Sequence, residues 1–320
     1  MVNIEPIKEA VRLAANLCAQ VQRHYLSRAD KDNREPVTIA DYGSQAIIGR
    51  ALMQHYPQDA VIAEESGQQF RELLNAEQKT QVLGLLSNLL DISVAEAVVA
   101  SWLDQGRNKA AAQTWVIDPI DGTKGFLAMR QYAIGVGLLV NGELAGSVMA
   151  APGYADGMGA LFYAENNVAY REPLAASEEG LRLHVSNRTD PFELRIVQSF
   201  ERAHASKERM AMVRQRLGIP ADNVEELDSM VKYALVASGE ADIYLRLPRK
   251  DNEYAHRAWD HAAGVALVLA AGGSVTDLEG NPLDFSQGAI LPHTGMVATN
   301  GHIHNRVLDI IQEVMAETGG

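Results

Sequence analysis

Asp118 and Asp121 lie close together in the sequence, near enough for their carboxylates to share one cation. They follow residues 115–117, a short apolar run typical of a buried strand, and Pro119 is expected to end that strand because it has no N–H to donate. Both aspartates should therefore lie on a bend. Because two carboxylates this close repel each other, we expect a hard divalent cation between them, with the carbonyl of Ile120 as a further ligand.

The next residues, Gly122, Thr123 and Lys124, are expected to open a helix. The first N–H groups of a helix have no partner within the helix, so they can hold a phosphate group. A simple turn is the alternative, because Asp, Pro and Gly are all common in turns. The apolar residues on both sides of the run favour a site.

Two further acids stand beside apolar segments. Glu64 follows a short strand pattern at 60–63, and Asp260 lies at the start of an Ala-rich helix pattern at 258–271. Alone, Asp260 would be explained by the helix dipole, which favours an acid at that end. Together with the first two aspartates, these acids make an all-oxygen set that suits Mg²⁺ or Mn²⁺.

Other polar residues are expected to have no role in the chemistry. His302 and His304 do not have the spacing of a zinc site and are expected to be exposed loop residues. Arg209, Arg214 and Arg216 are expected to form the solvated face of a helix.

The composition limits the partners of the chain. Of the 320 residues, 41 are acidic and 28 basic, and the net charge of −13 argues against general nucleic-acid binding. An anionic substrate would need bound metal and a local basic patch. No apolar run approaches a membrane span, and residues 1–9 lack a signal-peptide pattern. The one cysteine, Cys18, is expected to be a buried thiol, which fits a cytoplasmic location.

The elements that must position these acids begin with helices. Residues 4–25 and 38–56 have apolar side chains at helical spacing, with Asp41 near the start of the second helix. Residues 27–36 between them are expected to form a loop. Residues 68–112 predict a helical insertion between the two strands that carry Glu64 and Asp118.

An antiparallel meander is predicted next. Asn141-Gly142 joins strand patterns at 132–140 and 143–151, and this dipeptide in such a place is a strong hairpin signal. Two adjacent antiparallel strands argue against a simple Rossmann sheet. Further strands are expected at 161–163 and 168–171.

Residues 172–180 are the best candidate for a linker. We therefore predict an N-terminal α+β subdomain at 1–175, which carries most of the metal ligands, and a C-terminal α/β subdomain at 176–320. The second is expected to contain strands at 194–199 and 243–247 and helices at 206–217, 229–237, 258–271 and 305–315.

Three ordered motifs resemble those of the lithium-sensitive, magnesium-dependent phosphomonoesterase superfamily, which includes the inositol monophosphatases. They are Glu64-Glu65-Ser66, Asp118-Pro119-Ile120-Asp121-Gly122-Thr123 and Trp259-Asp260-His261-Ala262-Ala263-Gly264. The 3'(2'),5'-bisphosphate nucleotidase branch is resembled by Lys124-Gly125-Phe126-Leu127, Val37-Thr38-Ile39-Ala40-Asp41-Tyr42, Asp228-Ser229-Met230-Val231-Lys232-Tyr233 and Tyr244-Leu245-Arg246-Leu247-Pro248. After Leu127 the branch often has Arg-Gly, where this chain has Ala128-Met129 and then Arg130.

The resemblance implies a fold and a set of roles. The fold would be an αβαβα sandwich, and two or three Mg²⁺ ions, or Mn²⁺ in their place, would be held by Glu64, Asp118, the Ile120 carbonyl, Asp121 and Asp260. Asp41 and Thr123 would orient and deprotonate the attacking water, Glu65 would support the metal shell, and Gly122 and Thr123 would cradle the phosphoryl group. His204, Ser229, Lys232 and Arg246 would contact the 5'-phosphate and the adenosine.

The activity implied is hydrolysis of the 3'-phosphate of adenosine 3',5'-bisphosphate to AMP and phosphate, with inhibition by Li⁺. The sulfated relative 3'-phosphoadenylyl sulfate would be a second substrate, which would place the enzyme in sulfur metabolism. An inositol phosphate or fructose bisphosphate phosphatase is the nearest alternative. A non-catalytic nucleotide sensor is an alternative of another class, and the intact set of acids counts against it.

Overall fold

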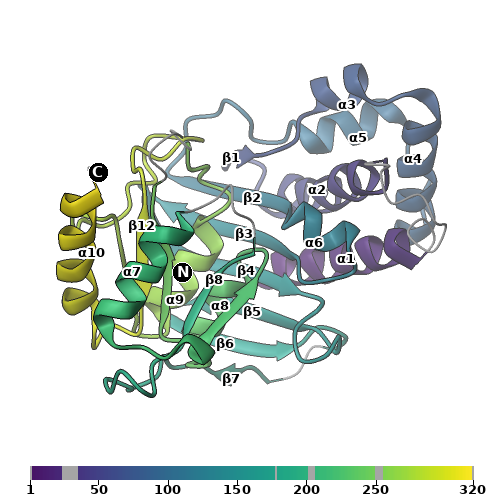
Figure 1. Cartoon of the computed structure of the whole chain (residues 1–320). Coiled ribbons are helices and arrows are strands. Elements are labelled where there is room, and N and C mark those ends of the chain that lie inside the picture. The colour runs from purple at the N-terminus through teal and green to yellow at the C-terminus, as the bar shows by residue number, and fades with distance from the viewer. Residues whose placement is uncertain (1, 24–34, 177–178, 201–205, 249–254, 319–320) are drawn as a thin grey trace.

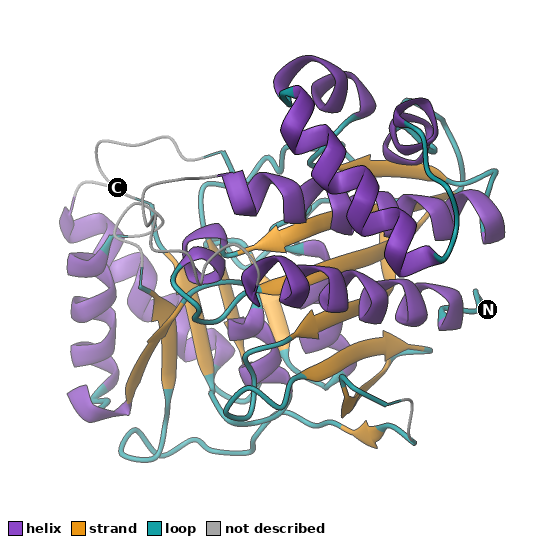
Figure 2. Ribbon diagram, turned by 90° about the vertical axis from the view of Figure 1, so that its right-hand side faces the viewer, coloured by secondary structure: helices purple, strands orange, loops and turns teal. Residues whose placement is uncertain are grey.

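Three layers of helices alternate with two β-sheets in the computed structural model (Figure 1). The structure describes residues 2–23, 35–176, 179–200, 206–248 and 255–318. The expected αβαβα sandwich is confirmed, and Figure 2 shows the strands of both sheets with helices on either side of them. Within the described residues, no helix has both the length and the apolar character that crossing a bilayer requires.

The first outer layer is a pair of packed helices, α1 (Glu5–Val21) and α2 (Glu35–His55). Both predicted helices are confirmed, and Cys18 is fully buried between apolar side chains. The predicted loop at 27–36 lies mostly outside the described residues. Pro36 belongs to the first turn of α2, where proline leaves no helical hydrogen bond unmade.

The first sheet has seven strands in chain order, with β1 parallel to β2 and every later pair antiparallel. Asn141 and Gly142 both have positive φ, at 54° and 86°, as the predicted hairpin requires. The strands are β1 (Ala60–Ala63), β2 (Gln113–Asp121), β3 (Ala133–Val140), β4 (Glu143–Ala151), β5 (Ala160–Glu165), β6 (Val168–Pro173) and β7 (Leu181–Arg182).

The prediction that Pro119 ends the second strand is wrong. β2 continues to Asp121, and its pairing with β3 shifts by a bulge between Asp118 and Asp121. Proline is tolerated at a bulge because the extra residue there needs no ladder hydrogen bond. The bend expected between the two aspartates is therefore present, but it is a bulge within one strand.

The predicted helical insertion is confirmed as three helices, α3 (Gly67–Leu73), α4 (Ala76–Leu90) and α5 (Glu96–Leu103). They form the lobe at the upper right of Figure 1, in which α4 and α5 pack against α2 and α3 packs against α5. Gly49 of α2 allows the close approach, because a Cβ there would stand 2.1 Å from the carbonyl oxygen of Trp102.

The second sheet has five strands in the order β11, β12, β10, β8, β9, with both parallel and antiparallel pairs. Its strands are β8 (Ile196–Ser199), β9 (Val224–Leu227), β10 (Ile243–Arg246), β11 (Ser274–Thr276) and β12 (Met296–Thr299). Its helices are α7 (Lys207–Leu217) and α10 (His304–Thr318) outside, and α8 (Val231–Ala237) and α9 (Ala262–Ala270) inside.

Helix α9 forms a layer shared by the two sheets, because it packs on β3, β4 and β5 as well as on β11. Glycines in β3 make this approach possible. A Cβ at Gly137 would stand 2.7 Å from the Cβ of Ala262, and one at Gly135 would stand 3.4 Å from the Cβ of Ala263 and 2.5 Å from the sulfur of Met230, the residue before α8. The division at residue 175 stays a prediction, and β7, the last strand of the first sheet, lies beyond it.

Two side chains expected at the surface are buried instead. Arg209 donates hydrogen bonds to the carbonyl of Pro248 at 2.7 Å and to the hydroxyl of Thr318 at 2.9 Å. His304, the first residue of α10, lies within hydrogen-bonding distance of two threonine hydroxyls on β11 and β12. The reasons differ: α7 packs against α10, which covers Arg209, whereas His304 is covered by the strands β11 and β12 at the start of α10.

Candidate active site

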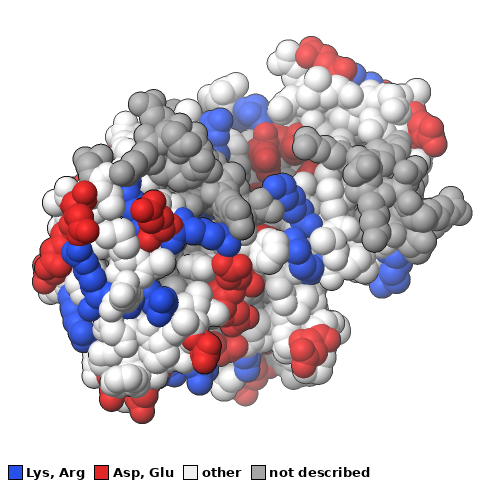
Figure 3. Space-filling model, viewed as in Figure 1, with Lys and Arg blue, Asp and Glu red and all other residues white. Residues whose placement is uncertain are grey.

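One pocket of about 230 Å³ collects most of the residues that the sequence singled out. In the space-filling view, acidic side chains gather in a hollow beside the lobe of α3 to α5, with basic side chains at its edge (Figure 3). The pocket is lined by Glu64, Asp118, Ile120, Asp121, Gly122, Thr123, Lys124, Ser199, Asp228, Ser229, Lys232, Arg246 and Asp260.

The bulged end of β2 supplies the floor of this pocket. Asp118 is buried and pairs across the sheet with Gly135, while Asp121 accepts a hydrogen bond from the backbone N–H of Met230 in the second half of the chain. Gly122 then turns the chain with a φ of 91° into α6 (Thr123–Leu127), so the predicted helix is present but short.

Glycine is required at position 122 for two reasons. Its left-handed conformation is costly for other residues, and a Cβ there would stand 2.8 Å from the Cβ of Ser229. The hydroxyl-bearing side chain of Thr123 is exposed at the start of α6. The bulge, the glycine and the helix therefore present Asp121 and Thr123 to the same pocket.

Glu64 and Glu65 follow β1 directly, and Asp41 lies on α2 behind them. Glu64 opens into the pocket, whereas Asp41 and Glu65 are not part of its lining. Burial and then the charges of Glu64 and Glu65 raise the pKa of Asp41 well above its usual value. Asp41 therefore belongs to the same group of interacting acids, although it is not among the lining residues.

Asp260 comes from the second half of the chain and lies in the turn before α9. His261 is the N-cap residue of that helix and makes no side-chain capping bond, so helix capping does not account for Asp260. Its carboxylate lies 3.9 Å from the guanidinium of Arg246. Asp260 and Arg246, from the second half of the chain, therefore lie close to the carboxylates of the first half.

The acids raise one another's pKa values. Burial, followed by Glu64, Asp121 and Asp260, raises the pKa of Asp118 well above its usual range. Loss of water, followed by Glu65, Asp260 and Asp121, raises the pKa of Glu64 to about 8. Burial and Asp260 raise the pKa of Asp121 to about 6, although Lys232 and Arg246 oppose the shift. Such a group can ionise fully only when positive charge is added to it.

The donor chemistry fits a hard divalent cation, because the acids in and behind the pocket offer only oxygen ligands. Among the described residues, no three acidic, histidine or cysteine side chains already converge around a single point as a ligand set. The negative charge and the oxygen atoms of the pocket thus suit such an ion. In the described part of the chain, the acidic side chains do not already surround a single point.

Two cations face the acids from the second half. Lys232 is buried and donates hydrogen bonds to the carbonyls of Leu227 and Ser229, and burial, followed by Arg246, lowers its pKa to about 7, with Asp121 opposing the shift. Arg246 is also buried and donates from Nε to the hydroxyl of Tyr244 at 2.8 Å. Both cations therefore lie beside the acids, and the predicted contact residue His204 lies outside the described residues.

Sequence reasoning passed over three lining residues, Lys124, Ser199 and Asp228. Asp228 forms an ion pair of 3.1 Å with Arg130, whose guanidinium lies 4.7 Å from the ring centre of Phe200. A signal was available for two of them, because Lys124 and Asp228 belong to motifs that sequence analysis quoted without giving these residues a site role. Ser199 had no such signal, since only the second sheet brings it there.

Met129 occupies a left-handed conformation with a φ of 56° and is exposed next to this wall of the pocket. Glycine adopts that conformation at the least cost. The chain therefore has a non-glycine residue in a left-handed conformation here, at the position where the resembled pattern often has glycine.

Comparison with known proteins agrees with this geometry. The sequence matches the inositol monophosphatase family over residues 3–316. It is 34% identical to 3'(2'),5'-bisphosphate nucleotidase 1 of Candida albicans over 95% of this chain and 93% of that protein. It is 34% identical to the 3'(2'),5'-bisphosphate nucleotidase of Oryza sativa, with 97% and 93% covered.

Solved structures show the same fold. The inositol monophosphatase from Anabaena (Nostoc) sp. PCC 7120 aligns with a TM-score of 0.61 and 23% identity over the whole of both chains. The extragenic suppressor protein suhB from Bartonella henselae aligns with a TM-score of 0.64 and 19% identity, covering 97% of this chain and 98% of that one. At these identities the likeness concerns the fold.

Proposed function

Because the chain belongs to the inositol monophosphatase family of phosphatases, we propose that it removes the 3'-phosphate of adenosine 3',5'-bisphosphate in a Mg²⁺-dependent reaction. The products are AMP and inorganic phosphate. The sulfated nucleotide 3'-phosphoadenylyl sulfate is a second substrate, which assigns the enzyme to sulfur metabolism. Relatives named as bisphosphate nucleotidases, at about a third identity over nearly the whole chain, support this choice of substrate.

One observation carries the proposal: a single pocket holds a group of acids that lacks enough positive charge of its own, together with two buried cations. Glu64, Asp118, Asp121 and Asp260, with the carbonyl of Ile120, would hold the metal ions, and Glu65 would support them. When bound, Mg²⁺ neutralises charge on the phosphoryl group and lowers the pKa of water. Mn²⁺ has the same preference for oxygen ligands.

Residues of the chain itself activate the water and hold the phosphoryl group. The hydroxyl of Thr123 accepts a hydrogen bond from the attacking water and donates one to the carboxylate of Asp41, which takes up the proton that the water loses. The backbone N–H groups of Gly122 and Thr123 hold the phosphoryl oxygens as the P–O bond to the 3'-oxygen breaks. Positioning of this kind is the main demand of phosphoryl transfer, in which the attacking and leaving oxygens lie in line.

Ser229, Lys232 and Arg246 bind the 5'-phosphate, with His204 as a further contact to the nucleotide. This group does not react, so attraction to it supplies binding energy that places the 3'-phosphate correctly. Lys232 and Arg246 are suited to an anion because both are buried basic side chains that line the pocket. The 5'-phosphate is doubly negative, so both side chains attract it.

The experiment is phosphate release from a panel of phosphate esters, with and without Mg²⁺. Adenosine 3',5'-bisphosphate is expected to be the best substrate, with little release in EDTA and much slower release from 3'-AMP. Faster release from an inositol phosphate or from fructose bisphosphate would show that the enzyme is a phosphatase for that substrate instead. Tight binding of the nucleotide without release of phosphate would indicate a sensor.

A further inference from the structure

Helix α2 presents three polar residues on one face, Asp41, Ser44 and Gln45, at the spacing that aligns side chains along a helix. Asp41 reaches the group of acids. Ser44 and Gln45 are almost completely buried, with exposures of 0% and 1%, although both are polar. Buried polar side chains need partners, and the partners of these two are the backbones that carry the acids.

Gln45 holds the turn after β1. Its amide nitrogen donates to the carbonyl of Glu65 at 2.6 Å, and its amide oxygen accepts from the N–H of Glu65 at 2.8 Å. One side chain thus pairs with both backbone groups of one residue, as a neighbouring strand would. Arg107 donates to the same carbonyl of Glu65 and to that of Ala63 at 3.3 Å. The segment that carries Glu64 is therefore fixed on both sides.

Ser44 holds the bulge of β2. Its hydroxyl donates to the carbonyl of Pro119 at 2.9 Å. Strand β2 pairs with β3 at Asp118 and again at Asp121, so Pro119 lies where the ladder is interrupted. The hydrogen bond from Ser44 replaces the missing ladder contact between the two aspartates. Successive residues of one helix turn thus fix the two backbones that carry Glu64, Asp118 and Asp121.

Repulsion among these carboxylates tends to separate the two backbones, and a cation site tolerates misplacement of only about 0.5 Å. We propose that Ser44 and Gln45 are positioning residues for the cation site, which set its affinity for divalent metal by holding the end of β1 and the bulge of β2 at a fixed separation. The inference rests on the proposed Mg²⁺-dependent function. Neither side chain touches metal or substrate.

The test measures metal binding directly. Ser44→Ala removes one hydroxyl, and Gln45→Met keeps the length of the side chain while removing its hydrogen bonds. Isothermal titration calorimetry of the folded variants with Mn²⁺ or Mg²⁺ is expected to show dissociation constants about 10- to 100-fold higher, the usual cost of disturbing the partners of metal ligands. The Mg²⁺-induced rise in Tm should shrink accordingly, and raising the Mg²⁺ concentration should restore much of the kcat.

Asn300→Ala is the matched control. Asn300 is 1% exposed and its amide donates to a backbone carbonyl at 2.9 Å, as that of Gln45 does, but it lies in a network at the far end of the second sheet. Its loss should lower Tm and leave metal affinity unchanged. If Gln45→Met does not fold, Gln45→Leu replaces it as the variant, because it also removes both hydrogen bonds without adding charge.

The outcomes separate the two proposals. Unchanged metal affinity in Ser44→Ala and in the Gln45 variant, with a lower Tm, would make these residues merely structural and overturn the inference alone. Weakened metal affinity in Asn300→Ala would also overturn it, because any loss of stability would then have the same effect. If the unsubstituted protein binds neither Mg²⁺ nor Mn²⁺, the proposed function and this inference fail together.

Discussion

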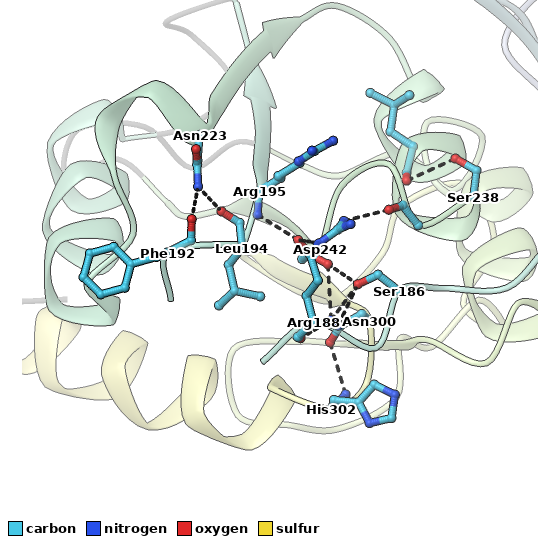
Figure 4. A network of polar contacts seen from close by, with 12 residues as sticks. Ser186, Arg188, Phe192, Leu194, Arg195, Asn223, Ser238, Asp242, Asn300 and His302 are labelled. Atoms are coloured by element: carbon cyan, nitrogen blue, oxygen red, sulfur yellow. Dashed lines mark hydrogen bonds and ion pairs between the residues drawn. The ribbon is translucent and has the colours of Figure 1, made fainter. Parts of the chain in front are cut away.

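Buried carboxylates lie at both ends of strand β10, but they differ in the charges that surround them. Asp242, just before the strand, is completely buried and receives hydrogen bonds from the hydroxyl of Ser186, from Arg188 Nε at 2.9 Å and from the backbone N–H of Arg195 at 2.7 Å (Figure 4). Arg246, the last residue of the strand, faces the acids of the pocket, which mostly face one another.

The difference lies in the source of the opposite charge. The protein supplies it to Asp242, mainly through Arg188, so that network stabilises the fold. In the pocket the positive charge must come largely from what binds, so the same residue type there makes the metal-free fold less stable. Buried acids alone do not identify a functional site. Buried acids whose partners are other acids do so more strongly.

Asp118→Asn should have the largest effect. The substitution removes a charged ligand from the pocket but also removes repulsion, so turnover is expected to fall by at least about 10²–10³-fold while metal-free stability is retained or increased. Phosphate release and thermal unfolding in EDTA measure the two quantities. Normal turnover at saturating Mg²⁺ would end the assignment of Asp118 to the metal site.

Thr123→Ala separates positioning from charge. The residue is exposed and carries no charge, so neither metal affinity nor Tm should change much. Loss of a group that orients the water is expected to lower kcat by about 10²–10⁴-fold. Steady-state kinetics with a Mg²⁺ titration will measure this, and an effect confined to KM would show that Thr123 only binds substrate.

Asp242→Asn should show the converse pattern. The guanidinium of Arg188 would lose its charged partner, and breaking such a pair is expected to cost roughly 3 kcal/mol of unfolding free energy. Denaturant unfolding measures the cost. At a temperature where the variant is folded, its kcat should match that of the unsubstituted enzyme, and a loss of activity without loss of stability would contradict the comparison.

Arg246→Met and Arg188→Met test the two arginines against each other. If Arg246 binds the 5'-phosphate, the preference for adenosine 3',5'-bisphosphate over 3'-AMP should shrink about ten- to a hundredfold, since a hydrogen bond to a charged group is worth about 1.5–3 kcal/mol. Arg188→Met should reduce stability and leave the preference intact. If Arg246→Met slows the hydrolysis of both substrates equally, Arg246 does not bind the 5'-phosphate.

The smallest effect expected is on pH dependence. An acid whose pKa is raised on folding favours the folded state when it is protonated, and that contribution is lost as the pH rises through the folded pKa. With folded pKa values of about 6 for Asp121 and about 8 for Glu64, Tm in EDTA should fall by a few degrees between pH 5 and pH 7. Saturating Mg²⁺ should reduce or reverse this fall, and a Tm that rises over this range in EDTA would contradict the shifts.

Local patterns predicted most of the fold, because helices and hairpins depend on neighbouring residues. The hairpin at Asn141-Gly142 and the helical insertion are examples. The predicted end of β2 was wrong because a strand can continue past a proline where another part of the chain supplies a hydrogen bond. Here Ser44 supplies it to the carbonyl of Pro119. The strands β9, β11 and β12 were missed. β9 carries two exposed glutamates and β11 has three residues, so neither shows a clear apolar run, whereas β12 is as long and as buried as the predicted β10 and was overlooked.

The motifs predicted the lining of the pocket well, because each motif lies at the end of an element whose place in the sheet follows from the fold. They did not predict Gln45 or the Asp242 network. The partners in that network come from segments far apart in the sequence, such as Ser186 and Asn300, so no local pattern announces them. Contacts of this kind become visible only when the two sheets are assembled.

The shared helix α9 has a consequence for how the protein is made. A ribosome completes β3, β4 and β5 well before residues 262–270, which cover one face of those strands. That apolar face, with Ala133, Met149 and Phe162 among its buried side chains, therefore stays uncovered for much of the synthesis. The first sheet can bury this face only after most of the chain has emerged, and until then the uncovered apolar surface is prone to aggregation.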